Sequence, residues 1–431
     1  MIKRKLVTAL LISLTLSGMS LGVVSAQDEI TLVVWDNFTR DSEQEMVETL
    51  NAEFEAANPG VTIQREIYDT ATLTELLPLA LSESTGPDVA MINQGIANMG
   101  ALVEAGLLLP LDEYAEQYGW LDRYGEGLHR RNRFTEGGEQ FGEGNLYGVS
   151  NTAEVVGVFY HKDIFEDLGL EIPTTLNEFE SVMQTLKDAG ITPLVFGSLD
   201  GWPAIHEYGA IQNAYTTTEA LDSLIFRFED GMFGSEADLT AAQKLVDWVN
   251  AGYFSEGFEG MDYDNATAGA FINKEGAMWL TGSWMSGTLS DQLDPESVGF
   301  FLLPDAAGSD VPIATGGVGV AYGIRATTEN PDLAAEYIDW VTGPRFAELL
   351  FEQGYLPAVP VDRTMVTEGT VTADVVNAWN AISSNDKVGH YLDWTIPYDE
   401  IVSSLQELLG GAVTPEQFVA DVQEAYAESA P

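Results

Sequence analysis

Hydrophobic and polar residues follow two alternating patterns along most of the chain. Residues 31–34 form a short run of β-branched and aliphatic residues, which is typical of a buried strand. Met46, Leu50 and Phe54 then recur at every fourth position, which is typical of the buried face of an amphipathic helix. The next expected elements are a strand, a helix and a strand at 61–68, 72–84 and 88–92. This alternation predicts an α/β fold.

Helix boundary signals extend the same pattern into the second half of the chain. A strand is expected at 155–160. Thr175 and Glu178 have the spacing of a capping box, which opens a helix that Gly190 ends. Near the C-terminus, residues 414–417 combine a threonine N-cap, a proline at the first helical position and a glutamine at the third. Both halves are therefore expected to be α/β.

Length and charge restrict the class of protein further. The chain has 431 residues, which is more than one hydrophobic core usually serves, so we expect two domains. Its net charge of −50 argues against nucleic acid and anionic membrane surfaces as partners, because both are polyanions. A hydrophobic content of 45% argues against a disordered chain.

The first 26 residues have the pattern of a signal peptide. Residues 3–5 are basic, residues 6–24 are apolar, and residues 24–26 offer small side chains for cleavage. We therefore assign 1–26 as a signal peptide of the Sec type, with an uncleaved anchor as the alternative. No second apolar run of about 18 residues follows, so no direct membrane anchor is expected.

The chain contains no cysteine. This excludes a disulfide, a thiolate metal site and a cysteine nucleophile. It also leaves no cysteine after the signal peptide to carry an N-terminal lipid. We therefore expect a protein that is free in a periplasm or outside the cell.

Motifs of common enzymes are missing from the sequence. It has no G-x-S-x-G, no H-E-x-x-H and no Walker loop. The glycines at 317 and 319 lack the third glycine of a dinucleotide loop, and the four histidines do not have metal-ligand spacing. We predict no catalytic residue, no metal and no cofactor. The many carboxylates leave a secreted carbohydrate-active hydrolase as an alternative, because a glycosidase needs only a pair of them.

The segment 269–287 carries the strongest candidate for a ligand-binding residue. A short strand there ends at Gly282 and Ser283, and Trp284 follows directly. Aromatic faces pack on the C–H patches of sugar rings, and neighbouring glycines let a ligand approach the backbone. Three further tryptophans stand at strand ends or in loops and are expected to contribute to the same stacking: Trp35, Trp202 and Trp394.

The order of several short motifs resembles the extracellular solute-binding proteins of family 1, the sugar-binding subunits of ABC importers, which include maltose-binding-protein-like receptors. The motifs are W-D-N at 35–37, G-P-D-V-A at 86–90, L-Y-G-V-S at 146–150, V-F-Y-H-K-D-I-F at 158–165, the Trp284 segment, G-G at 316–317 and N-P-D-L-A-A-E-Y at 330–337. The chain departs from the family at His161, where asparagine is usual, and at Leu176, where tryptophan is frequent. In the family both positions look like packing or helix-entry sites.

The resemblance implies a two-lobed, periplasmic-binding-protein-like fold, with a mixed sheet flanked by helices in each lobe and the ligand cleft between the lobes. The first lobe would hold 27–148 and 279–324, and the second 149–278 and 325–431. A carbohydrate ligand and ABC permease subunits are the implied partners, and we expect a monomer. A polyamine or another cation in the same fold is a further alternative.

Polar side chains that bind the sugar hydroxyls should come from loops facing the cleft. Five residues follow expected strands or adjoin the expected crossovers and aromatics, and they match positions where family members often place ligand contacts: Asn37, Asn93, Gln94, Glu154 and Asp393. Gly317 is expected beside the ligand as well.

Overall fold

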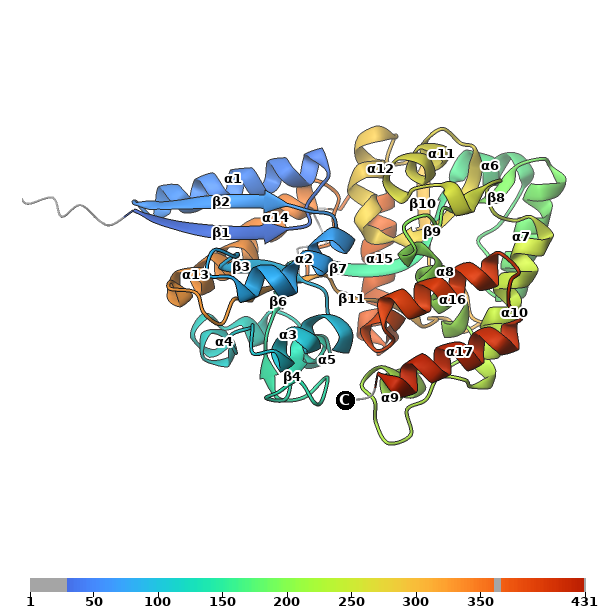
Figure 1. Ribbon diagram of the computed structural model, residues 1–431. Coiled ribbons are helices and arrows are strands. Elements are labelled where there is room, and N and C mark those ends of the chain that lie inside the picture. The colour runs from blue at the N-terminus through green and yellow to red at the C-terminus, as the bar shows by residue number, and fades with distance from the viewer. Residues whose placement is uncertain (1–28, 360–365, 430–431) are drawn as a thin grey trace, which may run out of the picture.

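The computed structural model describes residues 29–359 and 366–429. It has two α/β lobes, which lie on the left and right of Figure 1. Each lobe contains a sheet that mixes parallel and antiparallel strand pairs and is flanked by helices. The predicted two-lobed fold class is confirmed. The predicted signal peptide, residues 1–26, lies outside the described residues.

The first lobe is built on a five-stranded sheet. Its strands follow the order β2 (Val61–Ile67), β1 (Ile30–Asp36), β3 (Val89–Ile92), β12 (Ala321–Ile324) and β6 (Val149–Ser150). Leu32 and Val34 of β1 are fully buried, because alternate side chains of this interior strand face the core. At the end of β1 the carboxylate of Asp36, also fully buried, forms an ion pair with Arg65 of β2. The expected strands are therefore present.

Helices cover both faces of this sheet. Met46, Leu50 and Phe54 are buried on one face of α1 (Asp41–Ala57), as their spacing predicts. The other elements of the lobe are α2 (Thr70–Ser82), η1 (Ile96–Gly100), α3 (Ala101–Glu104), α4 (Asp112–Tyr118), η2 (Trp120–Asp122), α5 (Glu126–His129), η3 (Arg130–Asn132), the hairpin of β4 (Arg133–Phe134) and β5 (Asn145–Leu146), α13 (Pro331–Val341) and α14 (Pro344–Glu352).

The second lobe is built around β7 (Ala153–His161), the longest strand of its sheet. The order of strands is β13 (Val388–Gly389), β11 (Ala314–Val318), β7, β9 (Gly276–Gly282) and β8 (Thr192–Leu194), and β10 (Val298–Phe301) also pairs with β7. The helices and short helical turns of this lobe are α6 (Lys162–Leu168), α7 (Leu176–Asp188), α8 (Trp202–Asn213), α9 (Thr218–Ile225), α10 (Glu236–Ala251), η4 (Phe258–Gly260), η5 (Tyr263–Thr267), α11 (Ala268–Ile272), η6 (Ser283–Met285), α12 (Ser286–Gln292), α15 (Val371–Ser384), η8 (Leu392–Trp394), α16 (Tyr398–Leu409) and α17 (Pro415–Glu428).

The sheets correct the predicted division of the chain between the lobes. Residues 279–324 were assigned to the first lobe, but β9, β10 and β11 all belong to the sheet of the second lobe. Only β12 of that range pairs in the first sheet, antiparallel to β3. Residues 325–352 were assigned to the second lobe, but α13 and α14 pack against α1 in the first (Figure 1). The chain therefore passes between the lobes after β6, between β11 and β12, and after α14.

The two departures from the family pattern lie in packed positions. His161 is fully buried at the end of β7, where its ring stacks on Phe271 with 4.3 Å between centroids. Its Nε2 lies 2.8 Å from the Phe271 carbonyl oxygen. Leu176 is 1% exposed at the first position of α7, next to the Thr175 N-cap. Both side chains contribute to packing and not to the space between the lobes.

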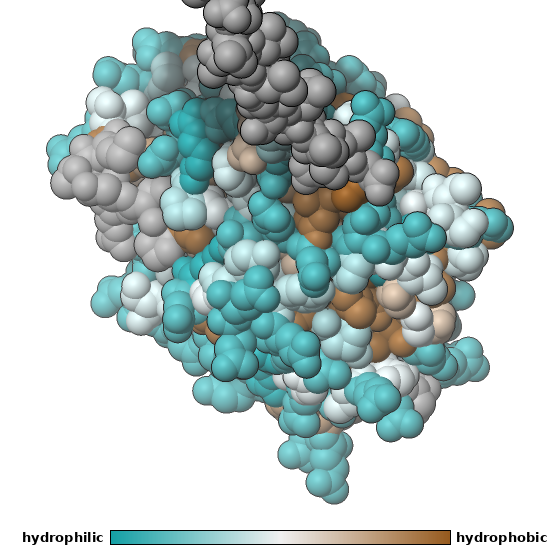
Figure 2. Space-filling model, turned by 90° about the vertical axis from the view of Figure 1, so that its left-hand side faces the viewer, coloured by the Kyte–Doolittle hydropathy of each residue, from teal (hydrophilic) through white to brown (hydrophobic). Residues whose placement is uncertain are grey.

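Hydrophilic residues dominate the face of the molecule that Figure 2 presents. This distribution agrees with the 68 acidic residues of the chain, since ionised side chains remain hydrated at the surface. No helix within 29–359 and 366–429 combines the length and apolar composition that a membrane span requires.

Candidate ligand-binding site

Four aromatic side chains of the second lobe form an aromatic cluster: Trp202, His206, Tyr263 and Trp284. Trp202 begins α8, and its ring centroid lies 4.4 Å from that of Tyr263 and 4.9 Å from that of His206. Trp284 lies 5.9 Å from Trp202 and 5.5 Å from His206. The indole nitrogen of Trp284 donates a hydrogen bond of 2.7 Å to the Tyr263 hydroxyl oxygen. These contacts hold rings from three separate chain segments in one fixed arrangement.

Tyr391 connects the aromatic cluster to a carboxyl group. Its ring lies 5.0 Å from His206 and 5.3 Å from Trp394 of η8. Its hydroxyl donates a hydrogen bond of 3.2 Å to Oε2 of Glu154 on β7. Aromatic faces and a hydrogen-bond acceptor therefore lie side by side, which is the combination that a sugar ring with its hydroxyl groups requires.

Burial changes the chemistry of two carboxyl groups at this site. Desolvation raises the pKa of Glu154 to about 7, although the hydrogen bond from Tyr391 by itself lowers this pKa. Desolvation also raises the pKa of Asp393 to about 6, and here the hydrogen bond from Asn93 acts in the opposite direction. Burial lowers the pKa of the neighbouring His206 to about 3, so that imidazole is neutral at physiological pH.

The first lobe contacts the site through the segment that follows β3. The amide nitrogen of Asn93 lies 3.4 Å from Oδ2 of Asp393. The amide of Gln94 donates to the carbonyl oxygens of Val318 and Gly319, at 3.3 and 2.7 Å. Gly95 then passes so close to Trp394 that a Cβ atom would lie 2.2 Å from its Cα. The two lobes are therefore in contact around the candidate site.

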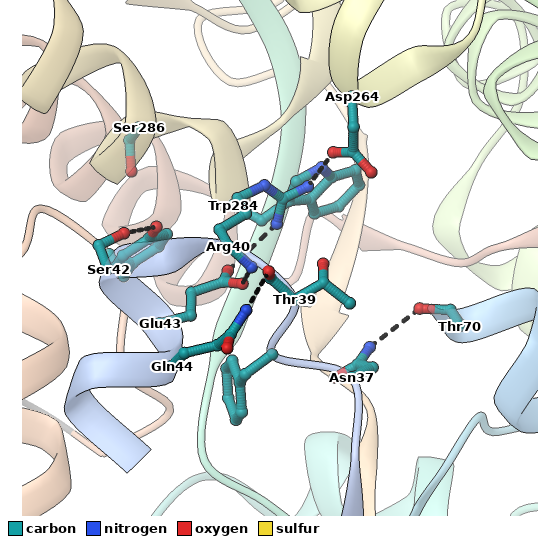
Figure 3. A network of polar contacts seen from close by, with 12 residues as sticks. Asn37, Thr39, Arg40, Ser42, Glu43, Gln44, Thr70, Asp264, Trp284 and Ser286 are labelled. Carbon is teal, nitrogen blue, oxygen red and sulfur yellow. Dashed lines mark hydrogen bonds and ion pairs between the residues drawn. The ribbon is translucent and has the colours of Figure 1, made fainter. Parts of the chain in front are cut away.

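A second bridge between the lobes starts at Arg40, just before α1. Its guanidinium donates to Oε1 of Glu43 at 3.1 Å and to Oδ1 of Asp264 at 2.8 Å. Glu43 belongs to the same lobe, whereas Asp264 lies on η5 of the other lobe, so Arg40 spans the boundary (Figure 3). The hydroxyls of Ser42 and Tyr355 share a hydrogen bond of 3.0 Å beside this pair.

Gly317 has a structural explanation that its sequence context did not suggest. Its φ is 143°, and a Cβ atom would lie 1.6 Å from Nη1 of Arg131. That nitrogen donates to the Gly316 carbonyl oxygen, and the other terminal nitrogen donates to the Gly389 carbonyl oxygen. The guanidinium carbon also lies 5.3 Å from the ring centroid of Trp394. The absence of a side chain at Gly317 thus leaves space for Arg131, whose guanidinium packs over the ring of Trp394.

The predicted site residues divide into two groups. The structure brings together eight of them around the boundary between the lobes: Asn93, Gln94, Glu154, Trp202, Gly282, Trp284, Asp393 and Trp394. Gly282 belongs to this group because the ring of Trp284 lies against it, where a Cβ atom would be 2.0 Å from the indole.

Four predicted residues have other contacts. Trp35 packs on Tyr68 with 4.9 Å between ring centroids, and Asn37 donates a hydrogen bond to Thr70 (Figure 3). The Ser283 hydroxyl accepts a hydrogen bond from the Val155 backbone amide, so it links η6 to β7. Gly317 contacts Arg131, as described above.

Several residues of this arrangement were not predicted from the sequence. Tyr263 and His206 were not selected, although His206 follows Trp202 by one helical turn, a spacing that places both on one face of α8. Tyr391 was also missed, two positions before the predicted Asp393. Arg131 was not among the predicted site residues either, and its guanidinium donates to the backbone carbonyl oxygens of Gly316 and Gly389. Within 29–359 and 366–429, no group of histidine, aspartate or glutamate side chains has the arrangement of a metal site.

Residues 39–348, well over half of the chain, match the family of bacterial extracellular solute-binding proteins. The chain belongs to this family. It is 25% identical to the multiple sugar-binding protein of Streptococcus mutans over 214 residues, which are 48% of this chain and 50% of that protein. It is also 25% identical to the maltotriose-binding protein of Pyrococcus abyssi over 341 residues, which are 76% of this chain and 66% of that protein. The matches thus span one half to two thirds of these relatives.

Solved structures show the same fold over nearly the whole chain. A chitin oligosaccharide binding protein has a TM-score of 0.81 at 23% identity and covers 94% of this chain and 100% of its own. A structure from a study of xylan utilization by Caldanaerobius polysaccharolyticus has a TM-score of 0.80 at 23% identity, with 92% and 99% covered. The binding protein RafE in complex with raffinose has a TM-score of 0.75 at 21% identity, with 93% and 100% covered.

Proposed function

We propose that this protein is the carbohydrate-binding subunit of an ABC importer. It binds a mono- or oligosaccharide between its lobes and delivers the sugar to a permease, without chemical change to the sugar. The observation that carries this proposal is the aromatic cluster beside Glu154 and Asp393, where ring faces and hydrogen-bond acceptors occur together. Trp284 and Trp202 would stack on the sugar, and the two carboxyl groups would accept hydrogen bonds from its hydroxyls.

The names of the relatives support a sugar as the ligand. The two curated relatives described above are a multiple sugar-binding protein and a maltotriose-binding protein, and RafE was solved with raffinose. Because these proteins are binding proteins, the comparison does not favour the hydrolase alternative. Membership of an extracellular family supports a location in a periplasm or outside the cell.

We further propose that ligand binding is coupled to closure of the lobes. The first lobe contacts the site through Asn93 and Gln94, and Arg40 reaches Asp264 of the second lobe. A ligand that contacts both lobes gains its full set of interactions only when they are together, so it favours the closed arrangement.

The first test is a thermal-shift and calorimetry panel of mono- and oligosaccharides with the protein lacking residues 1–26. A sugar that binds only the folded state raises the unfolding midpoint. We expect one sugar class to bind and to be recovered unchanged after incubation. Consumption of the sugar would establish the hydrolase, and binding of polyamines alone would change the ligand class.

A pair of variants then locates the site. Trp284→Ala should lower the affinity for the sugar by at least about 10-fold, because a stacked aromatic ring contributes more than 1 kcal/mol at a binding site. Trp340→Ala is the matched control, since Trp340 is also partly exposed and its indole also donates one hydrogen bond, to the Leu50 carbonyl oxygen. Equal losses of affinity in the two folded variants would place the ligand elsewhere.

A further inference from the structure

Within residues 29–359 and 366–429, no lysine or arginine forms an ion pair with either carboxyl group of the candidate site. Glu154 accepts a hydrogen bond from the neutral hydroxyl of Tyr391, and Asp393 accepts one from the neutral amide of Asn93. No lysine or arginine of the described chain contributes to the pKa of either group, which burial alone raises. Any negative charge that these groups carry is therefore not neutralised by a lysine or arginine of the described chain.

Two arginines close to the aromatic side chains of the site donate their hydrogen bonds to other groups. Arg131 lies behind Trp394, and its two terminal nitrogens donate to the carbonyl oxygens of Gly316 and Gly389. Arg40 donates to two carboxylates, Glu43 and Asp264, as Figure 3 shows. Neither guanidinium can turn toward a ligand without losing these bonds. Among the residues that the structure describes, the site thus holds acceptors and aromatic faces but no available cation.

This chemistry treats an uncharged and an anionic sugar differently. A hydroxyl group can donate a hydrogen bond to Glu154 or Asp393 whether these carboxyls are ionised or protonated. A carboxylate on the sugar would lose its hydration, would meet like charges and would lie against the negative faces of aromatic rings. We propose that the site selects uncharged carbohydrates and excludes sugars that carry a carboxylate. This inference rests on the proposed function and specifies its substrate class.

The experiment uses matched sugars. Maltotriose, raffinose, N,N′-diacetylchitobiose and lactose are first tested for binding to the protein lacking residues 1–26 at pH 8.5. The sugar that binds is then compared with two derivatives, one with a primary hydroxyl oxidised to a carboxylate and the other with that carboxylate methyl-esterified. Since like charges brought together cost several kcal/mol, we expect the carboxylate to bind about 100-fold more weakly or worse. The ester, which is larger but neutral, should recover most of the affinity.

Two further measurements separate charge from shape. At pH 5.5 both site carboxyls are largely protonated while the sugar carboxylate stays ionised, so the discrimination should shrink about 10-fold. Glu154→Gln, which preserves size and can still accept from Tyr391, should reduce the discrimination at pH 8.5 to a similar extent, with folding checked by circular dichroism. Asp393→Asn should also reduce the discrimination at pH 8.5, which tests the second carboxyl group independently.

Each outcome decides the inference. A carboxylate that binds within threefold of the neutral sugar at pH 8.5 overturns it. Equal failure of the carboxylate and its ester also overturns it, because sterics would then explain the exclusion. If no neutral sugar binds, including the wider panel described above, the proposed function fails and this inference fails with it. That last result is distinct from the first two, which leave sugar binding intact.

Discussion

The raised pKa of Glu154 makes a prediction that does not depend on the identity of the ligand. Glu154→Gln removes an ionisable group that folding transfers from water into the contact between β7 and Tyr391. The pKa of this carboxyl rises from an ordinary value of 4.5 to about 7 on folding. Below pH 4.5 both the folded and the unfolded protein hold this proton. The free energy of unfolding should therefore depend on pH in nearly the same way in the wild type and the variant there.

Between pH 4.5 and 7 the folded protein holds the proton and the unfolded chain has lost it. The free energy of unfolding of the wild type therefore falls as the pH rises through this window, and it falls no further above pH 7. One pKa unit corresponds to about 1.4 kcal/mol, so the shift sets an upper bound of about 3 kcal/mol. Glu154 is still partly exposed, so the effect should be smaller than this bound. We expect the free energy of unfolding of Glu154→Gln, relative to that of the wild type, to increase by about 1 to 2 kcal/mol from acid to neutral pH.

Urea unfolding at a series of pH values between 4 and 8.5 measures this difference. Glu178→Gln serves as a control of opposite sign, because hydrogen bonds from Thr174 lower the pKa of the exposed Glu178 carboxyl. Its contribution to stability is present above the unfolded pKa and is lost in acid, so that variant should lose stability relative to wild type as the pH rises. A difference between wild type and Glu154→Gln that stays constant with pH would refute the desolvation of Glu154.

Two further predictions concern packing and closure. Gly317→Ala should lower the free energy of unfolding by about 3 kcal/mol or more, because its Cβ atom would overlap the Arg131 guanidinium at a φ of 143°. Gly169→Ala is the control, because Gly169 has a φ of 65° and open space around the new Cβ. It should lower the free energy of unfolding by only about 1 kcal/mol in a urea titration. Similar losses in the two variants would contradict the overlap at Gly317. Asp264→Asn should weaken sugar binding about fivefold through faster dissociation, since exposed ion pairs such as that with Arg40 contribute up to about 1 kcal/mol. Stopped-flow dissociation should show this effect declining between 50 mM and 1 M salt, and an effect independent of salt would exclude the ion pair as its cause.

The local elements of the fold could be predicted from the sequence. The strands expected at 31–34, 61–68 and 88–92 correspond to β1, β2 and β3. Thr175 and Thr414 each accept a hydrogen bond from the backbone amide three residues later, as the capping patterns predict. Such features depend on interactions within a few residues, so the residue types in a short window are enough to specify them.

The candidate site was predictable only in part. Trp202, Trp284 and Trp394 could be selected because an aromatic residue at a strand end or in a loop, with glycine, aspartate or proline close by in the sequence, is typical of a ligand site. Trp35 has the same sequence context but packs on Tyr68. The sequence pattern cannot distinguish these cases, because it describes the neighbours along the chain and not the side chains that approach from elsewhere.

Many local elements, the family and the residue types available for binding could be recognised from the sequence. The tertiary structure alone decided that β9, β10 and β11 join β7 in the second lobe, whereas α13 and α14 return to the first. It also decided that His206 and Tyr391, 185 positions apart by their numbering (391 − 206), place their rings within 5.0 Å of each other. The physical reason is that strand pairing and ring packing are contacts between segments distant in the chain, and their geometry depends on the whole fold.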